Sequence, residues 1–408
     1  MPTDAAATPA LSVISDRINA LEAPQTIEMA KKARALAAQG VDVISLSFGE
    51  PDFQTPQYIK DAAKQAIDEG FTFYTPVPGI PELRQAICDK FKRDNNLDYK
   101  PENIVVGTGA KQALANAVLA LVNPGDEVII FSPFWVSYEE MVKLAEGVTI
   151  RLDGALDNDY KVTAAQLEAA ITPRTKLIMY SSPCNPTGAV WSREELGAIA
   201  EVVARHPQVL VVADEIYEYI NFVGEHASLA QFDAVKDQVV TVNGFSKGYA
   251  MTGWRIGYLA ARADVAAACE KLQSQITSAT CSITQRAGLA ALQGGRSSSD
   301  EMVAAYRRRR DLVLDIVKDI PGLVTPTPAG AFYIFPDVSA YFGKTTPSGD
   351  VIHSSRDLAM HLLNDGHVAA VDGGAFGAPR CLRFSTATAD EKLVEAFRRV
   401  KESLARLR

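Results

Sequence analysis

The stretch Asn243-Gly244-Phe245-Ser246-Lys247, followed shortly by Met251-Thr252-Gly253-Trp254-Arg255-Ile256-Gly257-Tyr258, is the most informative part of this sequence. The residues before it, 239–242, are β-branched and uncharged and precede the turn dipeptide Asn243-Gly244. They predict a short buried strand that ends at this dipeptide. Lys247 is therefore expected in a loop directly after a strand, with Arg255 eight positions further on.

The residue types in this stretch suit a phosphorylated aldehyde. Arg255 suits a phosphate because its donors are forked and its charge is permanent, and Ser246 can add a hydroxyl. A lysine in an apolar surround can lose its proton and condense with an aldehyde. The pattern therefore predicts a pyridoxal 5'-phosphate site. A lysine after a strand is more often a solvated loop residue, so Lys247 alone would not support this prediction.

Taken whole, the stretch resembles the cofactor-lysine motif of the class I aminotransferases, which are fold-type I pyridoxal-phosphate enzymes. The resemblance rests on the Ser246-Lys247 pair, the spacing to Arg255 and the Gly-Trp-Arg-Ile-Gly-Tyr ending, and it extends over nearly the whole chain. It implies that Lys247 is the catalytic lysine. It also implies a homodimer whose active sites are shared across the interface.

Composition sets limits on the function. The chain has 408 residues, of which 47% are hydrophobic and 22% charged, as in ordinary globular proteins of about two domains. The net charge of −8 argues against nucleic acid or an anionic membrane as the main partner. No apolar run approaches ~18 residues, and residues 1–10 lack a secretory signal, so we expect no membrane span and a cytoplasmic location.

The cysteines and histidines do not predict a metal site. The five cysteines are scattered and have no C-x-x-C spacing, and the five histidines show no H-E-x-x-H arrangement. This usage fits a reducing compartment.

A second loop predicts the phosphate site. Gly107-Thr108-Gly109-Ala110-Lys111-Gln112 lies between a predicted strand, 104–106, and a helical pattern, so free N–H groups at the helix start would face an anion. The loop matches neither the P-loop nor the dinucleotide fingerprint, and alone it could be only a tight turn. Together with Lys247 it predicts a phosphate cup made by Gly109, Ala110 and Lys111 with Ser246 and Arg255.

Two more predicted strands end in motifs of the same family. Residues 176–180 precede the sequence Asn185-Pro186-Thr187-Gly188, and residues 209–213 precede Asp214-Glu215-Ile216-Tyr217. An acid at the carboxyl end of a buried parallel strand lies where such sheets bind ligands, although a helix cap would also explain an aspartate there. The resemblance assigns Asp214 to the pyridinium nitrogen, and Asn185 and Tyr217 to the phenolic oxygen of the cofactor.

The resemblance assigns roles to two aromatic residues that would otherwise be read as packing. Trp135 follows the predicted strand 128–131 and would stack on the pyridine ring. Tyr74 precedes the helix signal at Pro81 and would reach the cofactor phosphate of the neighbouring subunit.

Residues near both ends of the chain are expected to form the substrate site. Gly49 stands in a Gly-Glu-Pro-Asp sequence that could be an ordinary turn. The resemblance implies that it approaches the substrate carboxylate through its backbone, beside Asn185 and Trp135. Arg383 lies in the predicted strand 381–385, where a buried arginine is costly unless it holds an anion. The family uses this arginine to grip the α-carboxylate in a bidentate fork.

Lys111 and Thr26 bear on substrate choice. Lys111 matches a lysine that binds the distal carboxylate in one aspartate aminotransferase subgroup, although a solvated helix-start lysine is the alternative. Thr26 resembles a position that accompanies prephenate acceptance. The residues around 243–257 resemble that subgroup most closely.

Strands and helices alternate over about residues 55–292, which predicts an α/β fold with a mostly parallel sheet covered on both faces. The resemblance implies a large cofactor domain, 53–303, and a small α+β domain made by 1–52 and 304–408. The four arginines at 307–310 are expected on a solvated helix face. Asp372 stands where the family often has a proline.

The predicted activity is ping-pong transfer of an amino group between L-aspartate or L-glutamate and the 2-oxo acids oxaloacetate and 2-oxoglutarate, with conversion of prephenate to arogenate as an extension. The alternatives on this fold are aromatic or alanine aminotransferases and lyases. From other classes, a cofactor-binding transcription regulator would need a DNA-binding module before about Ser12, and a nucleotide-binding protein would need a phosphate motif.

Overall fold

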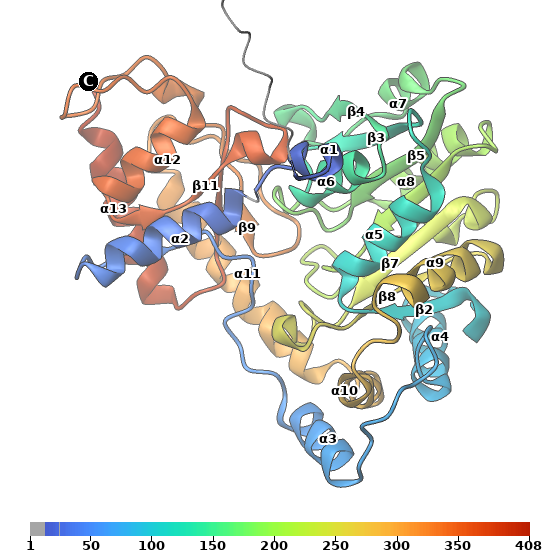
Figure 1. The fold of residues 1–408 in the computed structure, drawn as a ribbon. Helices are drawn as coiled ribbons and strands as arrows, with labels where there is room; N and C mark the ends of the chain where they lie inside the picture. The colour runs from blue at the N-terminus through green and yellow to red at the C-terminus, as the bar shows by residue number, and fades with distance from the viewer. Residues whose placement is uncertain (1–12, 24) are drawn as a thin grey trace, which may run out of the picture.

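A computed structural model describes residues 13–23 and 25–408 (Figure 1). Its centre is a seven-stranded sheet in the order β2-β8-β7-β6-β5-β3-β4. The strands are β2 (Ile104–Gly107), β3 (Glu127–Ser132), β4 (Val148–Asp153), β5 (Thr175–Ser181), β6 (Leu210–Asp214), β7 (Val239–Gly244) and β8 (Gly257–Ala260). The pairs from β4 to β7 are parallel, and β8 runs antiparallel to both of its neighbours, β7 and β2. The predicted α/β fold is confirmed.

Alternate residues of these strands face two separate layers of helices, as the two-residue period of a strand requires. On one face, Val128, Val212 and Val240 belong to an apolar cluster with α5 (Ala110–Leu121), α6 (Ser137–Leu144) and α9 (Ala263–Ile276). On the other face, Ile129 and Val211 pack with the second helix layer. That layer contains α4 (Pro81–Asn95), α8 (Arg193–Ala204) and α10 (Ser282–Gln293), and α3 (Gln57–Asp68) lies against α10. Burial of both faces explains why the inner strands β3, β6 and β7 are mostly apolar, whereas the edge strand β4 is partly exposed and carries polar residues.

Helix starts occur where the local signals predict them. Pro81 occupies the first turn of α4, and capping boxes at Thr163 and Ser192 begin α7 (Ala164–Ala170) and α8. Gly40, with φ of +86°, follows α2 (Gln25–Ala38) in the left-handed conformation that glycine adopts readily at a helix end.

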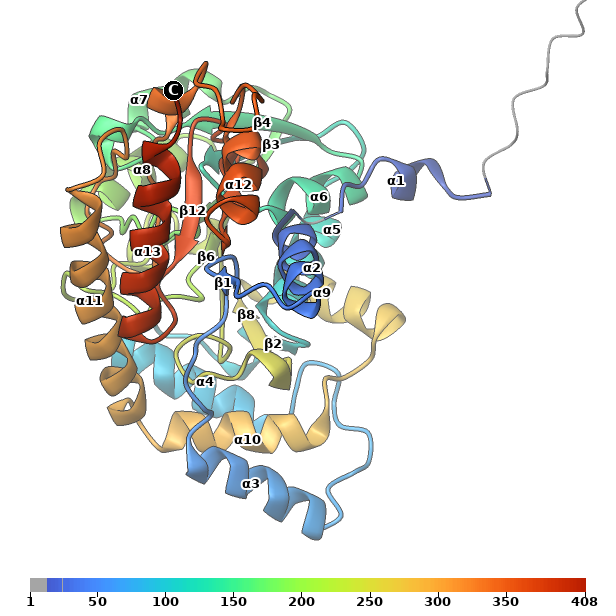
Figure 2. The ribbon, with the colours of Figure 1, turned by 90° about the vertical axis from the view of Figure 1, so that its left-hand side faces the viewer.

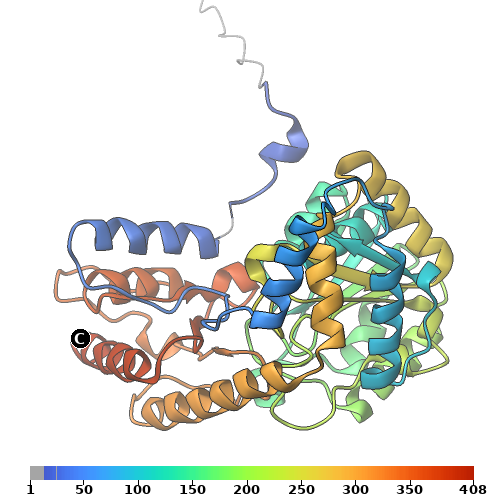
Figure 3. The ribbon, with the colours of Figure 1, turned by 90° about the horizontal axis from the view of Figure 1, so that it is seen from below.

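A second body combines the two ends of the chain. Strand β1 (Ile44–Ser45) pairs in parallel with β10 (Val368–Ala369), and β11 (Val371–Asp372), β12 (Leu382–Ser385) and β9 (Tyr333–Ile334) form an antiparallel sheet. Helix α2 shares an apolar cluster with α11 (Ser297–Val317), α12 (Ser355–Asn364) and α13 (Asp390–Ala405). Figures 2 and 3 show these helices grouped beside the large sheet, with α1 (Asp16–Asn19) standing out from the body on the side of α6. In the part of the chain that the structure describes, no helix is long and apolar enough to cross a membrane.

Two local predictions need correction, and the first concerns the end of β7. Asn243-Gly244 is not a turn, because β7 continues through it and Gly244 pairs with Gly257. Strand β9 begins only at Tyr333, and Ala331 just before it has a left-handed φ of +56° that interrupts extended structure.

The arginine run is not uniformly solvated. Arg309 is buried, and its guanidinium lies 2.8 Å from Asp52 and 3.2 Å from Asp390. The reason is that α11 passes between the N-terminal segment and α13, so one side of the helix must face both. Arg308, in contrast, is exposed and makes only a surface pair with Asp390.

Asp372 has a structural role that a proline could not fill. Its carboxylate accepts the Gly374 N–H at 3.0 Å and the Ser355 hydroxyl, so it caps the short 3-10 turn η7 (Gly373–Phe376) and ties it to the start of α12. The departure from the family pattern therefore keeps the loop ordered by a different interaction.

We expect Arg309→Ala to lower the free energy of unfolding by about 1–3 kcal/mol, because it leaves the Asp52 carboxylate without its cation and removes one of the two arginines that pair with Asp390. Arg308→Ala, at the neighbouring exposed position, should cost less than about 1 kcal/mol. Urea unfolding of both variants checks this, and equal losses would contradict the distinction between the two arginines.

Candidate active site

A cavity of about 540 Å³ lies at the carboxyl ends of β5, β6 and β7, where it is closed by residues from the second body. Twelve of the fourteen residues predicted for the site line it: Thr26, Gly49, Ala110, Lys111, Trp135, Asn185, Asp214, Tyr217, Ser246, Lys247, Arg255 and Arg383. Gly109 lies immediately behind it, and Tyr74 does not line it. The structure thus brings together residues from positions 26 to 383.

Lys247 reaches into this cavity from the turn after β7. Its amino group donates to the Gly49 carbonyl and lies 5.6 Å from the centre of the Tyr217 ring. Burial lowers the pKa of Lys247 to about 8; Glu50 opposes this shift, and the charges of Arg383 and Arg255 add to it. Part of the amino group is therefore neutral near physiological pH, as a nucleophile or base requires.

Asp214 ends β6 and is buried in the floor of the cavity. It accepts hydrogen bonds from the Tyr138 hydroxyl at 2.7 Å and from the Ile216 N–H at 3.2 Å. Burial raises its pKa to about 6 despite these bonds. A protonated ring nitrogen placed against Asp214 would favour its charged form.

The predicted phosphate cup has the shape and charge for an anion. Gly109 has φ of +83° and sits against the Arg255 guanidinium, so a side chain there would collide with it. Arg255 is fixed by a 2.8 Å hydrogen bond to the Thr252 carbonyl, and it faces the start of α5, where the first N–H groups have no helical acceptor. Ser246 completes the cup from the lysine loop.

Arg383 is a buried cation whose charge is not neutralised by the protein. It is 2% exposed, donates to Asn185 Oδ1 at 2.9 Å and to the Ser47 carbonyl at 2.7 Å, and has no partner for Nε. Among the described residues it makes no ion pair, and burial lowers its pKa. Rings of Tyr333 and Phe376 lie 4.5 and 4.9 Å from its guanidinium carbon. An anionic ligand would satisfy this group.

The sequence of this chain also matches known proteins. Residues 41–400 match the family model of aminotransferases of class I and II. The chain belongs to this family.

Several relatives have defined names. An aspartate/prephenate aminotransferase of Cereibacter sphaeroides is 48% identical over 97% of this chain and 100% of its own. A bifunctional aspartate and glutamate/aspartate-prephenate aminotransferase of Petunia hybrida is 43% identical over 97% of this chain and 83% of its own. The solved aspartate aminotransferase of Rhizobium meliloti superposes with a TM-score of 0.94 at 42% identity, over 97% and 99% of the two chains. The enzyme of Thermus thermophilus with maleate gives 0.90 at 40% identity, over 96% and 100%.

Lys111 lies at the border between the inner cavity of this aminotransferase and a larger, open one. Its amino group is 5.1 Å from the centre of the Trp135 ring and has no ion-pair partner among the described residues. Partial burial, together with the charge of Arg255, lowers its pKa. The amino group is therefore available to a ligand.

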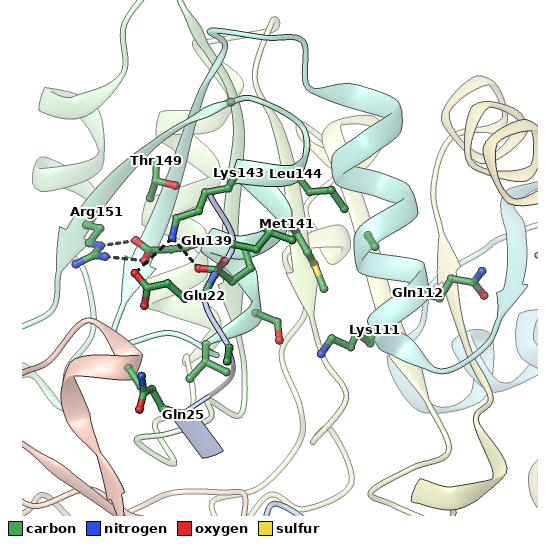
Figure 4. Close-up of a pocket in the computed structure, with 18 of the residues that line it drawn as sticks. Glu22, Gln25, Lys111, Gln112, Glu139, Met141, Lys143, Leu144, Thr149 and Arg151 are labelled. Carbon is green, nitrogen blue, oxygen red and sulfur yellow. Dashed lines mark hydrogen bonds and ion pairs between the residues drawn. The ribbon is translucent and has the colours of Figure 1, made fainter. Parts of the chain in front are cut away.

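The outer cavity, of about 1100 Å³, shares Lys111 and Arg255 with the inner one (Figure 4). Its other charges are already paired. Figure 4 shows Arg151 with Glu139 and Lys143 near Glu22, and Lys143 also pairs with Glu140. The outer cavity therefore has less unpaired positive charge to bind an anionic ligand than the inner cavity has.

Two further residues of this family member contact the predicted set and were not predicted. Tyr138 bonds Asp214, and the Tyr333 hydroxyl lies 2.6 Å from that of Tyr217 and next to Gly49. A side chain on Gly49 would meet the Tyr333 hydroxyl at 2.9 Å, which explains the glycine. The only sequence signal for Tyr138 was its place three positions after Trp135, and Tyr333 had none.

The lowered pKa of Lys247 has a consequence for stability. Its ordinary value is 10.5, so between about pH 8 and 10.5 the unfolded chain binds more protons than the folded one and stability rises with pH. We expect Lys247→Met to stabilise the cofactor-free protein by about 2 kcal/mol at pH 7, with the gain disappearing near pH 10.5.

Urea unfolding of parent and variant at the two pH values measures this difference. As a control, Lys161→Met removes a lysine that is paired with Glu195 and should lose stability at both. If Lys247→Met were less stable than the parent at pH 7, burial of the charged Lys247 amino group would not be what costs the folded protein stability.

Proposed function

We propose that this chain is a pyridoxal 5'-phosphate-dependent aminotransferase that moves the amino group of L-aspartate or L-glutamate to a 2-oxo acid. The observation that carries the proposal is a single cavity in which a lysine of lowered pKa lies between a buried carboxylate, Asp214, and a buried unpaired arginine, Arg383. The family match and the names of the relatives support it.

The residues present fit this cofactor. The cup of Gly109, Ala110, Ser246 and Arg255 would hold its phosphate, and Asp214 would hold the ring nitrogen. When bound, the cofactor supplies an aldehyde for the amino group and a ring that withdraws electrons from the α-carbon. Trp135 would cover the ring, and Asn185 and Tyr217 would donate to its phenolic oxygen.

The chain's own residues would then bind the substrate and move one proton. Arg383 and Asn185 would hold the α-carboxylate, with Gly49 closing from the backbone. Lys247, neutral in part near pH 8, would take the α-proton from the substrate and give it to the carbon that carried the cofactor's aldehyde oxygen. The proposal thus gives each buried charge in the cavity a partner.

A dicarboxylic substrate is favoured by the second cation. Arg383 and Lys111 line the same cavity, and among the described residues neither has a carboxylate partner. An amino acid with one carboxylate at each end would satisfy both. Thr26, on the same wall, is proposed to accompany use of prephenate as an acceptor, as the names of several relatives suggest.

We also propose a cytoplasmic homodimer whose sites are shared. Tyr74 is 98% exposed beside exposed Phe73, away from the cavity of its own chain, as expected if it serves a second copy. The domain division 1–52 with 304–408, and 53–303, is supported by the apolar cluster that joins α2 to α11, α12 and α13.

Addition of L-aspartate to the cofactor-loaded protein, without an oxo acid, should convert the absorption of the aldehyde form into that of the amine form and release one equivalent of oxaloacetate. Lys247→Ala should abolish both. If phenylalanine or alanine converts the cofactor but aspartate does not, the aminotransferase activity stands and the proposed preference for a dicarboxylic substrate is wrong. Release of ammonia without formation of the amine form would indicate a lyase.

Lys111→Ala should lower kcat/KM for aspartate by about 10- to 100-fold, because it removes a charge-assisted hydrogen bond to the distal carboxylate. The rate with alanine, which has no such carboxylate, should change less than about 3-fold on the same argument. Lys143→Ala is the matched control, since its cation lies in the outer cavity and is paired with Glu140. Equal losses with both amino acids would contradict the role of Lys111.

A further inference from the structure

A buried polar cluster lies behind the cavity and contacts two of the segments that form it. Its centre is Glu218, which follows Tyr217 directly and Asp214 by four positions. Glu218 Oε2 accepts a 2.6 Å hydrogen bond from the side-chain amide of Asn243, and Asn243 precedes Lys247 by four positions. One carboxylate therefore joins the turn that carries Asp214 and Tyr217 to the loop that carries Lys247.

The cluster is anchored from outside by α4. The Lys90 amino group contacts Glu218 directly, and Asn95 donates to Glu218 Oε1 at 2.9 Å while accepting from Lys90 at 2.8 Å. None of the four side chains is more than 6% exposed. Burial alone would raise the pKa of Glu218, but Lys90 and His226 outweigh it and hold the pKa at about 2, so the carboxylate stays charged.

The geometry at Asn243 favours positioning over mere packing. Its amide donates to Glu218, and its Oδ1 accepts the Gly244 N–H at 2.7 Å, so the side chain fixes the backbone at the end of β7. Buried ion pairs contribute little net stability compared with apolar residues of the same volume. The cluster is therefore better explained by the orientation that it imposes on both segments.

We propose that Glu218, acting through Asn243, is a positioning residue that holds the Lys247 loop in register with the turn bearing Asp214 and Tyr217. Neither Glu218 nor Asn243 lines the cavity, so neither touches a ligand. The inference rests on the proposed function, because the reacting group whose place it sets is Lys247. Misplacement of such a group by about 1 Å can cost about 100-fold in rate.

Two matched variants test the inference. Asn243→Ala cuts the link between the two site segments, and Asn95→Ala removes an equally buried amide from the same carboxylate without cutting that link. For Asn243→Ala we expect kcat to fall by about 10-fold or more, with KM changed less than about 3-fold. We also expect weaker binding of pyridoxal phosphate and an altered circular dichroism of the bound cofactor. Asn95→Ala should lower the melting temperature while kcat and the dichroism stay those of the parent.

The outcomes separate this inference from the proposed function. If the parent binds no pyridoxal phosphate, the proposed function fails. If the parent is active and the two alanine variants change kcat and dichroism alike, only the positioning role of Asn243 is overturned.

A further variant serves if Asn243→Ala does not fold. Glu218→Gln combined with Lys90→Met removes both charges but leaves a carbonyl oxygen that can accept from Asn243. We expect it to keep kcat within about 3-fold of the parent and the parent's dichroism. A loss of more than about 10-fold in a folded protein would show that the link through Asn243 is not what positions Lys247.

Discussion

The buried guanidinium of Arg383 is the constraint on which the rest of the site depends. A positive charge taken out of water costs several kcal/mol unless it is paired, and this one is held only by an amide oxygen and a backbone carbonyl. Two aromatic rings lie close to it, but they do not neutralise it. The protein therefore maintains a cationic position that a carboxylate can fill, and the fold supplies the stability to keep it so.

The same electrostatic logic extends to the other ionisable groups of the cavity. Lys247 is moved toward its neutral form and Asp214 toward its protonated form, in both cases because burial disfavours charge. A ligand that brings an anion, a cationic ring nitrogen and an aldehyde would reverse these penalties together. Activity and stability are thus opposed in this region, as they often are at functional sites.

Much of this arrangement follows from the sequence, because parallel strands deliver their carboxyl ends to one edge of the sheet. Asp214 and Asn185 could be placed there from the apolar strands that precede them. The contacts of Tyr138 and Tyr333 could not, because they depend on packing between bodies that are distant in sequence. The prediction of a solvated helix face was wrong for Arg309 for the same reason, because four identical residues in a row do not indicate which one faces a neighbouring element. Asn243-Gly244 has the composition of a turn, yet pairing with β8 and the bond to Glu218 override that local preference.

The contacts of the segment after β1 with β12 have a consequence for the order in which the site can form during synthesis. The Leu46 carbonyl accepts from Ser385, and the Ser47 carbonyl accepts from Arg383, so the backbone leading to Gly49 is held by residues more than 300 positions later. The strands of the central sheet, 104–260, emerge from the ribosome well before those partners. Residues 44–49 are synthesised early, but the C-terminal residues that they pair with are synthesised only near the end of the chain. The cofactor side of the site can thus form early, whereas the substrate side is completed only when the last strand has been translated.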